Sequence, residues 1–438
     1  MQPPREIPGF YYDPEKKKYF KILPHHAAPT AAFHTNTSIA EKNREKRRIE
    51  DLNSLTLHRA KRTRRTPLKA NPCIRATLYR ELTGDRSAEA IRSIYARGLQ
   101  RKVVWEADPG VKLSAFTTHT QADGTEFCII GTVAGDVRLS PLVKKKEGEL
   151  QVNMRESDQI IHGRSQISSV SVNSQGLVMA TFMGGPNRPP AIYCHWHPST
   201  SSDILHPGPA LFGFNRNHNI TSVWTSAASP NPQGDLVLGT NQGAVHIEVR
   251  PWNLEQTFQP IKSDVFAVSF LPNDPNPYLT GSRDGDIRIF DIRAGRDNRP
   301  VVMFRHGGPV THIRNLAQNR IIVNGLQRCA SYDLRYPHKK GPSANFGATS
   351  RAMRDYGQVG GEGSSLGLGF DVDVKRGLMV VAQQDGWVNL RSLETGEKIP
   401  SPLAKNRWDG LCKGLRFDEG EVARVWGIEQ RWVVAFDY

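Results

Sequence analysis

The feature that most constrains this chain is a phrase that occurs twice and ends a strand-like run each time. It combines an aromatic residue, an aspartate, an aliphatic residue and an arginine, at 290–293 (FDIR) and, 42 positions later, at 332–335 (YDLR). One blade of a β-propeller takes about 40–45 residues, so this spacing corresponds to a single blade. A repeated module that twice ends in an exposed arginine suggests a docking surface and not a catalytic centre.

Seven repeat units follow one another from about residue 102 to the last residue. Each unit opens with an alternating strand and continues with an apolar strand, and most units then have a turn and a third strand. Pairs such as Asp284-Gly285 and Asp385-Gly386 supply the positive φ that a two-residue hairpin requires. The first strands are expected to begin near Leu113, Ile167, Ile220, Val265, Val310, Leu368 and Leu411.

The last unit ends with its third strand, at 432–438, and has no residues left for a fourth. An open ring would leave unpaired strand edges, which favour aggregation. Residues 102–106 can supply the missing outer strand by pairing with the C-terminal blade. The sequence therefore predicts an all-β protein, a seven-bladed propeller over 102–438, whose seventh blade is shared by both ends of that region.

Residues 1–101 are expected to form a basic N-terminal arm that is partly helical and partly disordered. Residues 1–102 contain 23 Lys and Arg against 10 Asp and Glu, whereas the rest of the chain contains 35 against 33. One helix is expected near 38–50, which opens with a capping-box spacing, and another near 86–100, where Ile91, Ile94 and Leu99 share a helical face. The turn at Asp13-Pro14 should bring two aromatic pairs together.

The basic stretch from 42 to 65 has three interpretations: a nuclear import signal, a phosphate-binding arm or a solvated linker. Import is the first choice, which predicts a nuclear protein with a share in the cytoplasm. The stretch contains no aromatic residue, so it does not support base stacking on nucleic acid. The residues concerned are Arg47, Arg48, Lys61, Arg62, Arg64 and Arg65.

Catalytic and membrane functions find little support in the sequence. No apolar run reaches the roughly 18–20 residues of a membrane helix. His195 and His197 share a strand face, but no further ligand stands at metal-binding spacing. The glycine-rich run at 360–369 lacks the Gly-Lys-Ser/Thr ending of a phosphate loop. We therefore expect neither an enzyme nor a bound cofactor or metal.

The two phrases resemble WD40 repeats, with Phe290-Asp291 and Tyr332-Asp333 where Trp-Asp is usual. The longer run 278–293 resembles the signature of WD40 substrate receptors of the cullin-4 RING ubiquitin ligase, and 8–20 resembles the segment before the propeller in a member of this cullin-4-associated factor family. The resemblance implies docking on the ligase's damaged-DNA-binding adaptor and recruitment of protein substrates for ubiquitination. It also implies an adaptor contact made of Phe290, Asp291, Arg293, Tyr332, Asp333 and Arg335.

The chain also departs from the usual WD40 pattern. Many WD40 blades bury a network of His, Ser or Thr, Asp and Trp side chains. The fourth unit keeps Ser282 and Asp284 but has no histidine before its first strand, and the fifth has His306 but Gln327-Arg328 in place of Asp-Gly. Packing in these units is therefore expected to depend more on apolar strands.

Three alternatives stay open from the sequence. Each motif arginine could simply pair with a nearby acid and be solvated, although two such motifs in adjacent units favour docking. The helix at 86–100 could cap the propeller, or its residues Ile91, Ile94 and Leu99 could lie in a cleft of the adaptor. The rival function is a WD40 scaffold in an RNA or chromatin assembly, with the basic arm contacting nucleic acid.

Overall fold

The structure is a computed structural model that divides into two compact units, Met1–Gly84 and Asp85–Tyr438, and each is considered by itself. The first unit is described at residues 9–13, 17–21, 41 and 43–47. The second is described from 88 to 437 except at 122–123, 145–149, 153–157, 162, 164, 174–175, 197–209, 215–217, 231–233, 251–253, 273, 298–300, 318, 338–348, 362–364, 406 and 419–423.

The first unit contains a two-stranded hairpin formed by β1 (Phe10–Asp13) and β2 (Lys18–Lys21). Tyr12 lies opposite Tyr19 in the register, and their ring centroids are 4.9 Å apart. The aromatic residues on the two sides of Asp13-Pro14 therefore do lie together, as expected. Of the helix expected near 38–50, the described residues 41 and 43–47 are helical.

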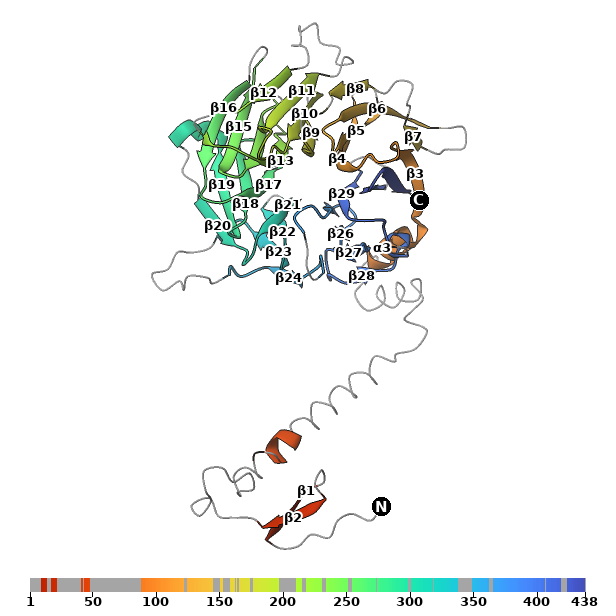
Figure 1. Cartoon of the computed structure of the whole chain (residues 1–438), viewed down its shortest axis with the longest axis vertical. Helices are drawn as coiled ribbons and strands as arrows, with labels where there is room; N and C mark the ends of the chain where they lie inside the picture. Colours follow the sequence, from red (N-terminus) through yellow and green to blue (C-terminus); the bar gives the residue numbers. More distant parts are fainter. Residues whose placement is uncertain are drawn as a thin grey trace. The chain divides into compact units, whose positions relative to one another are not determined.

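The second unit is a ring of seven antiparallel sheets, which are the blades of a β-propeller (Figure 1). The fold class predicted from the sequence is therefore confirmed. The strands of blades 1 to 3 are β4 (Leu113–Thr120), β5 (Glu126–Thr132), β6 (Val137–Lys144), β7 (Leu150–Val152) and β8 (Asp158–Ile161); β9 (Ile167–Val172), β10 (Leu177–Phe182), β11 (Ala191–Trp196) and β12 (Ala210–Gly213); β13 (Val223–Ala228), β14 (Leu236–Thr240), β15 (Gly243–Val249) and β16 (Leu254–Pro260).

Blades 4 to 7 follow in the same order along the chain. Their strands are β17 (Val265–Phe270), β18 (Pro277–Ser282), β19 (Asp286–Asp291) and β20 (Val301–Arg305); β21 (Val310–Ala317), β22 (Arg320–Gly325), β23 (Cys329–Asp333) and β24 (Arg354–Gly357); β25 (Phe370–Asp373), β26 (Leu378–Ala382), β27 (Val388–Ser392) and β28 (Lys398–Ile399); β29 (Cys412–Phe417), β30 (Val425–Glu429), β31 (Trp432–Asp437) and β3 (Gln100–Glu106). Short 3₁₀ segments, η5 (Ile292–Asp297) and η6 (Pro402–Ala404), follow β19 and β28.

The ring is closed at its centre and at its outer edge. The first strand of each blade contacts the first strand of the next, and β29 of the last blade contacts β4 of the first. At the outer edge β3 pairs with β31, with Gln100 opposite Asp437 and Glu106 opposite Trp432. Val104 and Trp105 of β3 are buried in the core between these blades. The outer strand of blade 7 thus precedes blade 1 in the sequence.

Close packing between blades depends on small residues in the second strands. At Gly281 of β18 an added Cβ would lie 2.3 Å from a methyl carbon of Val310 in the next blade, and at Gly131 of β5 it would lie 2.5 Å from Ile167. These distances are far inside van der Waals contact, so a side chain at either position would push the neighbouring blade away. The two glycines therefore set how closely successive blades approach.

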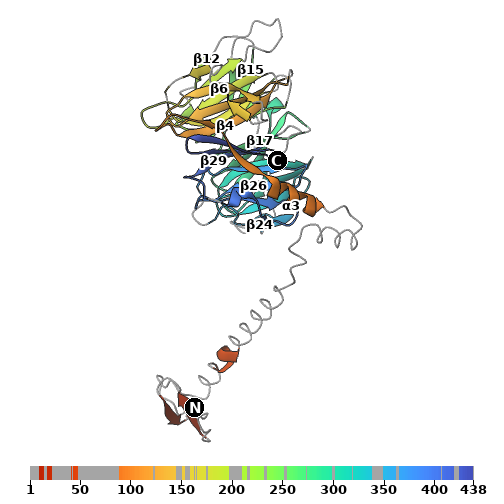
Figure 2. The same cartoon turned by 90° about the vertical axis from the view of Figure 1, so that its right-hand side faces the viewer.

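Helix α3 (Ala88–Gly98) leads directly into β3 and lies against β27 and β28 of blade 6 (Figure 2). Ala96 and the following Leu99 are fully buried in the core shared by blades 6 and 7. Arg92 donates from Nε to the carbonyl oxygen of Arg376, at 2.9 Å, and forms an ion pair of 2.9 Å with Glu394. One face of α3 therefore belongs to the propeller.

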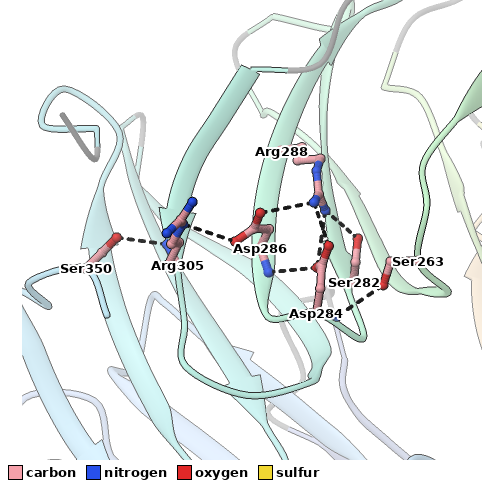
Figure 3. Close-up of polar contacts among 7 residues, drawn as sticks. All are labelled: Ser263, Ser282, Asp284, Asp286, Arg288, Arg305 and Ser350. Carbon is pink, nitrogen blue, oxygen red and sulfur yellow. Dashed lines mark hydrogen bonds and ion pairs between the residues drawn. The ribbon is translucent and has the colours of Figure 1, made fainter. Parts of the chain in front are cut away.

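Blade 4, which has no histidine before its first strand, has a polar network centred on an arginine of its third strand (Figure 3). Arg288 donates from Nη2 to Asp284, at 2.6 Å, and to Asp286, at 3.0 Å, and from Nη1 to the Ser282 hydroxyl, at 3.1 Å. The Asp284 amide in turn donates to Ser263, and Arg305 of β20 lies 3.7 Å from Asp286. These contacts fix the hairpin turn between β18 and β19 to its surroundings.

Blade 5 contains the histidine but in a different network. The Nε2 atom of His306 lies 2.9 Å from the carbonyl oxygen of Arg328, and its Nδ1 lies 2.9 Å from the hydroxyl of Tyr332. Because a carbonyl oxygen can only accept, Nε2 carries the proton and Nδ1 accepts from the tyrosine. Burial lowers the pKa of His306 to about 4, which keeps the ring neutral in the folded protein.

The neutral state of His306 predicts a loss of stability in mild acid. The folded-state pKa lies below the unfolded value of about 6.5, so the contribution is complete above that value and is lost as the pH falls towards 4. From about pH 7.5 to pH 5 the free energy of unfolding should fall by about 2 kcal/mol through this group. Urea unfolding of wild type and H306Q at both pH values measures it. Equal pH dependence in the two proteins would contradict the assignment.

The pairing of β3 with β31 predicts where the chain can be shortened. A chain lacking 1–84 should unfold cooperatively with nearly the full stability, because it keeps α3 and β3. A chain lacking 1–106 should aggregate, because it loses Val104 and Trp105 from the core and exposes the edge of β31. Size-exclusion chromatography and thermal unfolding distinguish the two. A soluble, cooperatively folding 107–438 fragment would show that the closure is dispensable.

Candidate docking surface on adjacent blades

The two repeated phrases end the third strands of blades 4 and 5, β19 and β23. Phe290 lies opposite Tyr278 of β18, and Tyr332 lies opposite Ile321 of β22, so the two phrases occupy equivalent positions in their sheets. Both therefore end on the same rim, away from the hairpin turns that precede the two strands. Since the blades are neighbours, Arg293 and Arg335 stand on adjacent segments of that rim.

The aspartate of each phrase holds its arginine in the same way. The backbone N–H of Arg293 donates to Oδ1 of Asp291 at 3.0 Å, and its side chain donates from Nε to Oδ1 at 3.0 Å and from Nη2 to Oδ2 at 2.6 Å. Arg335 makes the same three bonds to Asp333, at 3.0, 2.9 and 2.6 Å. The arginines are therefore fixed by a local turn and a two-pronged ion pair.

The ion pairs are stable at neutral pH and leave the arginines accessible. Hydrogen bonds from Arg335 lower the pKa of Asp333 to about 2, and those from Arg293 lower the pKa of Asp291. The side chains of Arg293 and Arg335 are 66% and 58% exposed. Because Nε and Nη2 face the aspartate, the Nη1 edge of each guanidinium points away from it and suits a carbonyl or carboxylate oxygen.

The aromatic and acidic residues of the phrases have structural roles. Phe290 and Tyr332 are buried in the blades, so the structure corrects their assignment to the adaptor contact: they anchor the strand ends from inside the core. Asp291 and Asp333 orient the arginines. Only Arg293 and Arg335 of the six proposed contact residues present most of their side chains to a partner.

Exposed apolar side chains lie near the ends of the strands that precede the two arginines, and the sequence did not single them out. Val301 of β20 is 57% exposed and pairs with Ile289, two positions before Asp291. Met353 is 53% exposed and its N–H donates to Ser331, two positions before Asp333. Tyr336 is 74% exposed, with its ring 5.8 Å from the Arg335 guanidinium. Arginine beside exposed aromatic, Met and aliphatic groups is typical of protein interfaces.

Helix α3 divides its candidate residues between core and surface. Leu99 is buried, which corrects its assignment as a partner contact. Ile91 and Ile94 are 65% and 46% exposed on the helix that Arg92 fastens to blade 6. Both interpretations of this helix therefore apply to different residues of it: one face caps the propeller, and the other leaves two isoleucines uncovered.

The remaining sequence candidates are only partly described. Arg47 is helical and exposed, whereas Arg48, Lys61, Arg62, Arg64 and Arg65 lie outside the described residues, so nuclear import stays a prediction. His195 stacks on Tyr193 at 6.3 Å between ring centroids, and His197 also lies outside. No group of three His, Cys, Asp or Glu side chains within the described ranges is arranged to hold a metal ion. None of the described helices has the length and apolar character needed to span a membrane.

Comparisons with known proteins extend over nearly the whole chain. It is 24% identical over 425 residues to human DDB1- and CUL4-associated factor 4, covering 92% of this chain and 80% of that protein. It is 24% identical over 362 residues to WD repeat-containing protein 21 of Schizosaccharomyces pombe, covering 77% and 78%. The WD40 β-propeller domain of Doa1 superimposes with a TM-score of 0.54 at 13% identity, covering 77% of this chain and 97% of that one.

These comparisons confirm the resemblance to WD40 proteins of the cullin-4-associated factor family that the repeated phrases indicated. The likeness to the Doa1 domain concerns the fold alone, because the sequence identity is low. No family model matches the chain. The match to factor 4 covers 92% of the chain and therefore spans the region that contains both repeated phrases.

The division of α3 between core and surface predicts opposite effects of the same substitution. I91S/I94S should change the free energy of unfolding by less than about 0.5 kcal/mol, because both side chains are exposed. L99S should cost about 2–5 kcal/mol, because it removes a buried leucine and places a hydroxyl in the core. Urea unfolding measures both. A large loss in the double variant would show that the isoleucines are covered in solution.

Proposed function

We propose that this chain, a WD40 propeller similar along most of its length to DDB1- and CUL4-associated factor 4, is a substrate receptor of a cullin-4 ubiquitin ligase. It would dock on DDB1, the damaged-DNA-binding adaptor, and recruit proteins for ubiquitination without performing covalent chemistry itself. The observation that carries the proposal is the pair of exposed arginines, each held by its own aspartate, on the same rim of adjacent blades.

The geometry explains how such a surface can bind tightly with few contacts. A free arginine side chain loses about 2 kcal/mol of rotamer entropy when a partner immobilises it. Asp291 and Asp333 have already restricted the two arginines before the partner arrives, so less entropy is lost on docking. Val301, Tyr336 and Met353 then supply apolar area around the two guanidinium groups.

The rival proposal, a scaffold that contacts nucleic acid, receives less support from the propeller. The excess positive charge belongs to residues 1–102, and the remaining 336 residues carry a formal net charge of only +2. Phosphate contacts depend on clustered cations and weaken steeply with salt. In our proposal the basic arm instead directs the protein to the nucleus, where the receptor would meet its substrates.

Charge reversal of both arginines tests the docking surface. R293E/R335E should weaken binding to purified DDB1 at least about 100-fold, because each buried arginine contact is worth roughly 1–2 kcal/mol or more and reversal adds repulsion. The melting temperature should stay within a few degrees of wild type, because both side chains are exposed. Biolayer interferometry with the full-length chain measures the affinity.

A matched control is available on the opposite rim. Arg283 lies in the turn between β18 and β19, is 71% exposed and pairs with Asp264, which precedes β17. R283E should therefore bind DDB1 like wild type. If R293E/R335E also binds like wild type, the chain does not use this rim to reach the adaptor and the proposed docking surface is wrong.

A further inference from the structure

A third phrase of the same kind ends the third strand of blade 3, although two of its residue types differ from those of the first two phrases. The run Ile247-Glu248-Val249-Arg250 has an aliphatic residue in place of the aromatic one and glutamate in place of aspartate. Ile247 of β15 lies opposite Leu236 of β14, as Phe290 lies opposite Tyr278 in blade 4. Counted along the strand, Arg250 therefore stands in blade 3 where Arg293 stands in blade 4, although β15 stays paired with β16 through Val249, whereas in blade 4 a 3₁₀ segment follows Asp291.

Two further features align the strands of blade 3 with those of blade 4. Ile247 is fully buried, as are Phe290 and Tyr332 at the matching positions. Gly239 of β14, like Gly281 of β18, leaves no room for a side chain against the first strand of the next blade. The pair Leu236–Ile247 in blade 3 therefore corresponds to the pair Tyr278–Phe290 in blade 4, although the hairpin turn of blade 3 is one residue shorter.

Arg250 is held by acids and remains accessible. Its Nη2 lies 2.8 Å from a carboxylate oxygen of Glu248 and 3.8 Å from one of Glu255, the residue opposite Glu248 on β16. The Arg250 side chain is 56% exposed, close to the values of Arg293 and Arg335. Blade 3 differs from blades 4 and 5 in this second acid, so two carboxylates share one guanidinium.

The row of equivalent positions changes character at blade 6. In blade 6, Met379 pairs with Arg391 as Tyr278 pairs with Phe290 in blade 4. Counted from these pairs, Ser392 corresponds to Asp291 and Glu394 corresponds to Arg293. The guanidinium at this position comes from Arg92 of α3, which is 12% exposed and pairs with Glu394. The arc of accessible arginines therefore runs from blade 3 to blade 5 and ends where α3 begins to cover the rim.

We propose that Arg250 belongs to the docking surface, so that the partner binds an arc of three guanidinium groups on blades 3, 4 and 5. The inference rests on the proposed function, in which that partner is DDB1. The matching surface of the partner would offer a row of backbone carbonyl or carboxylate oxygens, one group for each blade. Glu255 limits the contribution of blade 3, because it adds a negative charge next to the contact.

Two single substitutions test the third member of the arc in the full-length chain. R250E should weaken binding to purified DDB1 about fivefold to twentyfold, less than R293E/R335E, because this contact lies at the end of the arc. E255Q should strengthen binding about twofold to fivefold, because it removes the extra carboxylate and keeps the shape of the side chain. R250Q, which keeps the aliphatic stem, should fall between wild type and R250E.

The outcomes separate this inference from the function on which it rests. If R250E and E255Q both bind within twofold of wild type while R293E/R335E loses binding, the arc ends at blade 4 and the third contact is wrong, but the receptor proposal stands. If R293E/R335E binds normally, both fall. Thermal unfolding of every variant, with R283E as the exposed control, confirms that a loss of binding is not a loss of fold.

Discussion

Pairing between β3 and β31 is the interaction on which the rest of the propeller depends. Without it the seventh blade would present an unpaired edge, and the apolar face between blades 7 and 1 would lie open around Val104 and Trp105. The closed ring in turn fixes the angle between successive blades, and blades 1, 3 and 4 pack on the next blade through Gly131, Gly239 and Gly281, positions that admit no side chain. Residues far apart in sequence therefore acquire constant spacing along a rim.

Much of the fold could be predicted because its signals are local. The turns at Asp284-Gly285 and Asp385-Gly386 need glycine at positive φ, and both glycines adopt it. The site was harder to predict. The helical period identified the face that carries Ile91, Ile94 and Leu99, but which residues the propeller covers depends on Arg92 reaching blade 6. Arg250 was missed because its correspondence to Arg293 is a property of strand register. In the sequence, Ile247 and Glu248 stand where the repeated phrases have an aromatic residue and an aspartate.

The departures from the usual WD40 network show that different side chains can connect a blade's hairpin turn to its third strand. Arg288 in blade 4 and the pair His306–Tyr332 in blade 5 both tie the second hairpin turn to the third strand, one through charge and the other through neutral hydrogen bonds. A search for the usual residues reads both blades as degenerate. Arg288, His306 and Tyr332 nevertheless all have hydrogen-bond partners, as buried polar side chains generally do.

The aspartate that accompanies each motif arginine has a kinetic consequence. The field of an ion pair of opposite unit charges 2.6 Å apart falls off with distance faster than that of a lone arginine, and salt screens it further beyond roughly 10 Å. Such a surface attracts or repels a distant charged molecule less than two unpaired arginines would. The association rate constant at this surface should therefore depend less on ionic strength than it would with unpaired arginines. Propellers that carry the same arginine–aspartate pairs could then compete for one partner with little electrostatic preference.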